Sequence, residues 1–224
     1  MNIDMIEKLI AKDWYLQRWT IAGYLLGGAV AIGLLGFGGE AAFTAGMILL
    51  ITVLMALGMH VAMATVVAER TEKTLPFVMS LPISPIDYAT SKIAANLLIF
   101  LVPWTAMVLG TIAVILARGG VPDGLLPYTV LTLTVIFVNY CIVLCAALIS
   151  ESMGWTIGVM AVCNLGFQAF IFGISRIDGI AATMKGPVVI WTADALAVLG
   201  AEIATVVILL ALTYWQQARK TDFL

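Results

Sequence analysis

Long runs of apolar residues constrain this chain more than any other feature. Each run is close to the length that a helix needs to cross the hydrocarbon core of a bilayer. Because backbone groups in lipid must be bonded within the chain, such runs predict helices. The chain is 62% hydrophobic and 11% charged, whereas soluble domains are far more polar. We therefore expect an all-α integral membrane protein, one transmembrane domain over 1–224 with six spans at about 19–37, 43–68, 91–117, 128–149, 155–174 and 196–215.

The first eighteen residues, 1–18, predict an amphipathic helix. Ile3, Ile6, Ile10 and Trp14 recur at helical spacing, and charged residues fall between them. Such a helix can lie in the headgroup layer beside the first span. The alternative is a polar helix packed on a partner. The mixed charge of this region is typical of a retained first span rather than of a cleaved secretory signal.

Lysine and arginine are distributed unequally between the two sides of the predicted membrane domain. Six spans place both termini on one side, together with Lys8, Lys12, Arg18, Arg70, Lys73, Lys92, Arg219 and Lys220. The other side holds Arg118, Arg176 and Lys185, and a semi-apolar segment, 175–195, that we expect to rest at the interface or partly re-enter. The positive-inside rule then places both termini and residues 69–92 in the cytoplasm. The net charge of -2 by itself says nothing about nucleic acid, because a phosphate-binding surface needs clustered lysine and arginine; we expect no nucleic acid partner.

Residues 68–92 are the longest charged and proline-containing interruption between apolar runs. Thr74 can cap a short helix that ends before Pro82. Ser84-Pro85-Ile86-Asp87 has the pattern of a capping box with proline at the first helical position, so a second helix should begin there and run into the third span. The simplest interpretation is a connecting loop with good caps. Exposed apolar residues such as Phe77, however, favour docking to a protein or to the bilayer surface.

The pattern Glu69-Arg70-x-x-x-Thr74, followed by Leu75, Ser80-Leu81-Pro82-Ile83-Ser84 and Lys92, resembles the segment after the second span of ABC-2-type transporter permeases. Lys73 stands where that family often has glycine. The resemblance extends to the six spans, the N-terminal interfacial helix and the semi-apolar segment before the last span. It implies a subunit of an ATP-binding cassette exporter in a bacterial or archaeal plasma membrane.

In such transporters the segment between spans 2 and 3 is the coupling helix, which docks on a separate ATP-binding subunit. The resemblance implies that the coupling residues are Glu69, Thr74, Leu75, Phe77, Val78, Met79, Leu81 and Pro82. It also implies a second permease chain, identical or different, and membrane lipids as surroundings. The sequence contains no phosphate-binding loop of the Gly-x-x-x-x-Gly-Lys-Ser/Thr type. ATP and magnesium are therefore expected in the partner, and this chain is expected to have no cofactor and no enzymatic activity of its own.

Polar residues inside the spans are the remaining functional candidates, because such residues are unfavourable in lipid. The family's use of spans 2 and 5 points to a substrate path with Thr52, His60, Asn164 and Gln168. The alternative for each is interhelical hydrogen bonding, which we favour for Asn139. Glu202, in the outer part of span 6, could pair with Arg176 or Lys185, or reach water.

Two other classes of function stay open. A non-transporting scaffold or sensor would also dock a cytoplasmic partner. A membrane-embedded enzyme would need paired acids, clustered histidines or a nucleophile beside a base, and the chain has a single histidine. The cysteines Cys141, Cys145 and Cys163 all lie within apolar runs without further ligands nearby, so we interpret them as packing residues.

Overall fold

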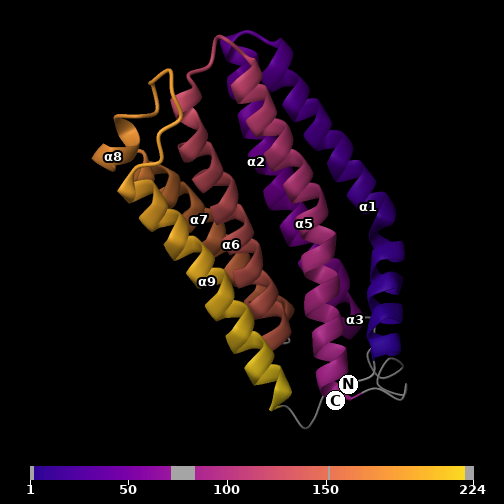
Figure 1. The fold of residues 1–224 in the computed structure, drawn as a ribbon. Coiled ribbons are helices and arrows are strands. Elements are labelled where there is room, and N and C mark those ends of the chain that lie inside the picture. The colour runs from indigo at the N-terminus through magenta and orange to yellow at the C-terminus, as the bar shows by residue number, and fades with distance from the viewer. Residues whose placement is uncertain (1–2, 72–83, 151, 220–224) are drawn as a thin grey trace.

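The computed structural model describes residues 3–71, 84–150 and 152–219, and in these ranges the chain is helical with connecting turns. Figure 1 shows a bundle of long helices. The long elements are α1 (Ile3–Phe37), α2 (Glu40–Ala62), α5 (Pro85–Ala117), α6 (Leu126–Ser150), α7 (Met153–Ile174) and α9 (Ala193–Ala218). The short ones are a π-helical turn (Met63–Val67), α3 (Ala68–Thr71), a 3₁₀ turn (Asp123–Leu125) and α8 (Asp178–Ala181).

Six of the described helices are long and apolar enough to cross a membrane. This number agrees with the sequence-based prediction, and each predicted range lies within one helical stretch. The second stretch continues from α2 through the π-helical turn into α3. The chain is therefore a multi-pass membrane protein. We call the end of the bundle where α1 begins and α9 ends the lower end, as in Figure 1, and the opposite end the upper end.

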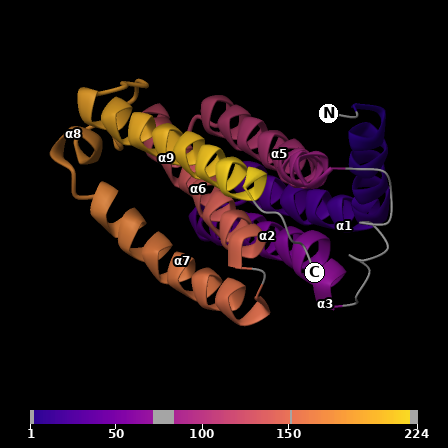
Figure 2. The ribbon, with the colours of Figure 1, turned by 90° about the horizontal axis from the view of Figure 1, so that it is seen from below.

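Helix α6 forms the centre of the bundle. It contacts α2, α5, α7 and α9, and Figure 2 shows it surrounded by these helices. In its most apolar window 67% of the residues are buried, compared with 11% in α9. The outer helices instead turn large apolar side chains such as Trp155 and Leu165 outward. Such an exposed apolar surface is what lipid contact requires.

The N-terminal region is helical and runs directly into the first span, as its amphipathic pattern predicted, and its place in the headgroup layer stays a prediction. Residues 3–37 form one continuous helix, because no proline interrupts them and the first glycine is Gly23. Figure 2 shows the first turns of α1 at an angle to the rest. Ile6, Leu9 and Asp13 are buried, and Asp13 is paired with α5. These turns thus pack on the chain's own helices, which neither of the two sequence-based alternatives included.

The segment 175–195 forms α8 and a series of turns at the upper end (Figure 1). Ile180 packs with Leu131, Ile174 and Ala195. The amide of Gly124 donates a hydrogen bond of 3.0 Å to the carbonyl of Gly186. The segment therefore covers the ends of α6, α7 and α9, and does not re-enter between the spanning helices.

The predicted capping box at the start of α5 is confirmed. Ser84 is extended, its hydroxyl accepts a hydrogen bond from the Asp87 amide, and the Asp87 carboxylate accepts one from the Ser84 amide. Two otherwise unbonded amides are satisfied in this way. The short helix predicted after Thr74 lies outside the described residues.

Candidate functional site

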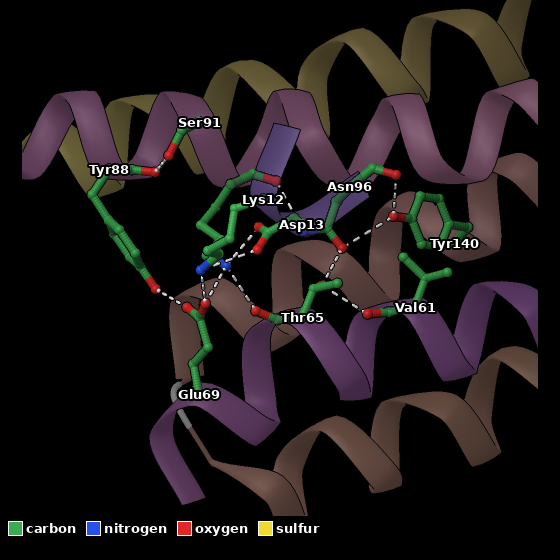
Figure 3. Close-up of polar contacts among 10 residues, drawn as sticks. Lys12, Asp13, Val61, Thr65, Glu69, Tyr88, Ser91, Asn96 and Tyr140 are labelled. Carbon is green, nitrogen blue, oxygen red and sulfur yellow. Dashed lines mark hydrogen bonds and ion pairs between the residues drawn. The ribbon is translucent and has the colours of Figure 1, made fainter. Parts of the chain in front are cut away.

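A cluster of four charged residues lies at the lower end and joins the helices on either side of residues 72–83 (Figure 3). Lys92 of α5 places its Nζ 2.7 Å from Asp13 Oδ2 and 2.7 Å from Glu69 Oε1. Lys12 Nζ lies 2.9 Å from Glu69 Oε1 and 3.2 Å from Asp13 Oδ1. Asp13 and Lys12 belong to α1, and Glu69 belongs to α3. The four side chains therefore tie α1, α3 and α5 together.

The charges in this cluster balance, and most of them are buried. The side chains of Lys92 and Asp13 are 2% and 5% exposed, that of Glu69 is 13% exposed, and that of Lys12 is 38% exposed. A buried ion needs a close partner of opposite charge because water no longer stabilises it. Two lysines and two acids in mutual contact meet this need. Lys12 forms the edge of the cluster that water reaches.

Hydrogen bonds fix the geometry of the cluster. The Tyr88 hydroxyl donates to Glu69 Oε2 at 3.1 Å, and Lys92 also donates to the carbonyl of Thr65 at 3.1 Å. Thr65 lies in the π-helical turn, where the hydrogen-bonding pattern changes and carbonyls can turn away from the helix. Lys92 thus binds both the Thr65 carbonyl of the second span and the carboxylate of Glu69, which follows that span.

A second layer of polar contacts extends the cluster into the bundle. The Thr65 hydroxyl lies 2.7 Å from both the Val61 carbonyl and Asn96 Oδ1, so its proton can be donated to either. The Tyr140 hydroxyl of α6 donates to the Asn96 carbonyl at 2.8 Å. Figure 3 shows these side chains in a row from the charged cluster to Tyr140. The network therefore connects the lower end to the central helix.

Helical spacing explains how the sequence builds this site. Residues four apart share a helix face, and polar residues of the site stand four apart on two of the contributing elements. They are Thr65 and Glu69 on the second span, and Tyr88, Lys92 and Asn96 on α5. Sequence reasoning singled out Glu69 and Lys92 but missed the others. The shared spacing of four was the signal that could have found them.

Ionisation at the edge of the cluster is shifted toward the charged forms. Burial alone would raise the pKa of Glu69, but the ammonium groups of Lys92 and Lys12 outweigh it and hold that pKa below its usual value. Burial alone would lower the pKa of Lys12, but its bonds and charge interactions with Glu69 and Asp13 outweigh it and raise that pKa. Each group is thus stabilised as an ion by its partners.

Of the predicted coupling residues, Glu69 is the one that the structure describes. Its carboxylate points to Lys12, Lys92 and Tyr88 of the same chain (Figure 3). The other predicted coupling residues, Thr74, Leu75, Phe77, Val78, Met79, Leu81 and Pro82, lie outside the described residues. Glu69 thus holds the end of α3 in place, at the start of the predicted coupling segment.

The predicted path residues lie on an open face of α2 and α7. Thr52 and His60 of α2, and Asn164 and Gln168 of α7, are all exposed in the single chain. The Asn164 amide nitrogen lies 3.9 Å from the sulfur of Met59, so it is brought next to α2. The four residues do not converge on an enclosed cavity.

Other polar groups of the spans lack partners within the part of the chain that the structure describes. Glu202 is 5% exposed and neither carboxylate oxygen has a hydrogen-bond partner. It therefore pairs with neither Arg176 nor Lys185, and it does not reach water, because it faces the interior of the bundle instead. Asn139 lines a small cavity between α2, α6 and α7, and its amide nitrogen is unpaired, so the expected interhelical bond from this nitrogen is not formed.

The cysteines act as packing residues, as predicted. Cys141, Cys145 and Cys163 are buried free thiols, and the hydroxyl of Thr213 lies 2.7 Å from Cys145 Sγ. Among residues 3–71, 84–150 and 152–219, no three histidine, cysteine or acidic side chains gather in a way that could hold a metal ion. The chemistry that the described site offers is ion pairing between helices.

No protein-family model, curated protein or solved structure matches this chain. Its function is therefore inferred from the sequence pattern and from the geometry of the cluster.

Proposed function

We propose that this chain is the transmembrane permease subunit of an ABC-2-type ATP-binding cassette exporter. A separate ATPase subunit would dock on the segment between the second and third spans, in the cytoplasm. The sequence pattern of residues 69–92 and the six helices long enough to span a membrane support this proposal. The lower end of the bundle is then the cytoplasmic end.

The observation that carries the proposal is the ion cluster at both ends of the predicted coupling segment. Glu69 lies just before residues 72–83, and Lys92 follows them on α5; the two are joined directly at 2.7 Å. Both are also joined to α1 through Lys12 and Asp13. A displacement of the segment by an ATPase would therefore move the lower ends of three helices together. A plain connecting loop needs no such attachment.

We place the transport path at the open face of α2 and α7. Asn164 and Gln168 are exposed there, and amide side chains are unfavourable in contact with lipid. A second permease chain, identical or different, would cover this face and enclose a path between the two chains. His60 and Thr52 would line the side contributed by α2.

Docking can be tested by affinity purification from native membranes. The tagged chain should recover an ABC-type ATPase, and the double variant Phe77→Asp, Met79→Asp should lose it. A matched control places two aspartates at the upper end, Val188→Asp and Ile190→Asp, where both side chains are exposed. The control should retain the ATPase. Recovery of no ATPase by the unaltered chain, or equal recovery by both double variants, would contradict the docking assignment.

Coupling requires a second measurement, because a scaffold would also bind its partner. ATP hydrolysis by the recovered ATPase should change when the chain is added in liposomes, and Lys92→Met should weaken this change while binding persists. Lys8→Met, an exposed lysine on α1, serves as the control. Hydrolysis that is independent of the chain would favour the scaffold over the permease.

A further inference from the structure

Helix α9 packs on α6 along one stripe of buried residues (Figures 1 and 2). Side chains at intervals of seven and four share one face of a helix, and the members of the stripe are Ala195, Glu202, Val206, Thr213 and Gln217. Ala195 belongs to a cluster with Leu131 of α6 near the upper end. Gln217 donates a hydrogen bond to the Leu148 carbonyl near the lower end. Glu202 lies between these two contacts on the same stripe, so its side chain also faces α6.

Glu202 differs from the other polar residues of the stripe because it has no hydrogen-bond partner. The Thr213 hydroxyl lies 2.7 Å from Cys145 Sγ, and Gln217 bonds to the backbone of α6. Glu202 is 5% exposed, and across residues 3–71, 84–150 and 152–219 neither of its carboxyl oxygens finds a partner. It lies about 14 Å from the start of α9 at the rise of an α-helix. This depth is near the middle of a hydrocarbon core of about 30 Å.

The helices around Glu202 supply no charge that could stabilise an ionised carboxylate. Helix α9 contacts α5, α6 and α8. Residues 93–117 of α5 and the whole of α6 contain no acid, lysine, arginine or histidine. The titratable side chains of α6 are neutral at neutral pH; they are Tyr128, Tyr140, Cys141 and Cys145.

The charged residues of these helices lie at their ends. Asp87 and Lys92 of α5 take part in the helix cap and the ion cluster at the lower end. Asp178 of α8 and Asp194 of α9 are exposed at the upper end. Glu202 is thus the acid that the bundle holds among apolar side chains, apart from these charges.

A carboxyl group in such surroundings must be neutral. An isolated ionised carboxylate away from water is so unfavourable that the group takes up a proton instead. A metal ion would need several oxygen ligands, and in the described ranges no three histidine, cysteine or acidic side chains gather. A proton needs only one of the two carboxyl oxygens.

We propose that Glu202 is a proton-binding site within the membrane. The carboxyl group binds a proton while α9 is packed on α6, and it releases the proton when water reaches this position. Any movement that separates these two helices is therefore accompanied by release of a proton. The site is independent of the proposed coupling to an ATPase.

The first test is infrared spectroscopy of the purified chain at neutral pH, in a detergent without carbonyl groups. The carbonyl stretch of a neutral carboxyl group is separate from the bands of a carboxylate. The unaltered chain should show this stretch, and Glu202→Gln, which keeps the shape of the neutral side chain, should lose it. Glu40→Gln is the matched control, because Glu40 is an exposed acid at the start of α2. Absence of the band from the unaltered chain, or its persistence in Glu202→Gln, would overturn the proposal.

The second test is the number of protons released when the chain is unfolded by sodium dodecyl sulfate in an unbuffered solution at neutral pH. The unaltered chain and Glu40→Gln should each release one proton per chain, because the carboxyl group of Glu202 reaches water. Glu202→Gln should release none. Glu202→Met fills the same space and should also release none, which keeps the test available if the glutamine variant does not fold. Equal release by the unaltered chain and a position-202 variant with the size-exclusion profile of the folded protein would refute the site. Loss of the infrared band on addition of sodium chloride would show that a metal ion displaces the proton, and would also contradict it.

Discussion

Replacement of Lys92 by methionine should destabilise the chain more than any other single change in the cluster. Methionine keeps much of the length of the lysine side chain and fills the same buried space. It removes the ammonium group that lies 2.7 Å from both Asp13 and Glu69 and 3.1 Å from the Thr65 carbonyl. Loss of one partner from a buried ion pair costs about 3–5 kcal/mol. Lys12 stays beside both acids, so we expect a value near the lower limit.

A double-mutant cycle makes this prediction specific to the ion pair. Asp13→Asn alone should cost about 1.5–3 kcal/mol, because Lys92 loses a charged hydrogen-bond acceptor. In the double variant Asp13→Asn, Lys92→Met, Glu69 still has Lys12, and no unpaired acid remains at position 13. The combined loss should therefore be smaller than the sum of the two single losses by about 1–3 kcal/mol.

The measurement is the free energy of unfolding in detergent micelles titrated with sodium dodecyl sulfate. Lys8→Met, which changes an exposed lysine on α1, should leave the unfolding curve unchanged. A decrease in the free energy of unfolding below about 1 kcal/mol for Lys92→Met would refute the reasoning, since loss of one partner from a buried ion pair should destabilise the fold by more than this. Strict additivity of the two single variants would refute the direct coupling of Asp13 and Lys92.

Three further predictions concern pH, helix packing and capping. The folded pKa of Glu69 lies below its usual 4.5 and that of Lys12 above its usual 10.5, so the stabilisation by these groups should be constant between these pH values. The stabilisation should fall below pH 4.5 as Glu69 is protonated, and above pH 10.5 as Lys12 is deprotonated. The destabilisation caused by Glu69→Gln should therefore become smaller in acid. A destabilisation that becomes larger in acid would contradict the lowered pKa of Glu69. Gly46→Ala places a Cβ 2.8 Å from a backbone carbonyl of α1 and should lower the free energy of unfolding by about 1–3 kcal/mol. The Cβ of Gly33→Ala has no atom within 4 Å, so this variant should be neutral or stabilising in the same unfolding assay. Ser84→Ala should cost about 1 kcal/mol through loss of the helix cap, with faster hydrogen exchange in the first turn of α5, and Ser84→Asp should restore both.

The tertiary structure also changes how the charge asymmetry is understood. Lys12 and Lys92 count among the cations of the side predicted to be cytoplasmic, yet both are paired with acids of the same chain. Their charges are thus balanced within the protein, that of Lys92 in the buried part of the cluster and that of Lys12 at its exposed edge. Arg18, by contrast, is exposed and stacked on aromatic rings. A count of lysine and arginine along the sequence cannot separate these two situations.

Local patterns in the sequence were sufficient for the helices and for one of their ends. Span length follows from the run of apolar residues, because each stretch must bury its own backbone polar groups in lipid. The capping box at Ser84 was predictable because its hydrogen bonds lie within four consecutive residues. Local evidence also predicted the helix at residues 1–18, but its packing on α5 through Asp13 depends on a contact distant in sequence.

The ion cluster was decided by the tertiary structure alone. Asp13 and Lys92 meet because α1 and α5 pack side by side in one register, and no local pattern encodes that register. Considered separately in the sequence, Asp13 and Lys92 each look like an ordinary charged residue at the end of a membrane span. Their burial becomes favourable only when opposite charges arrive at the same place, since an isolated ion would not be stable there. The apolar pattern thus determines that six helices form, and the packing of those helices determines that Glu69 and Lys92, on either side of residues 72–83, are both joined to α1.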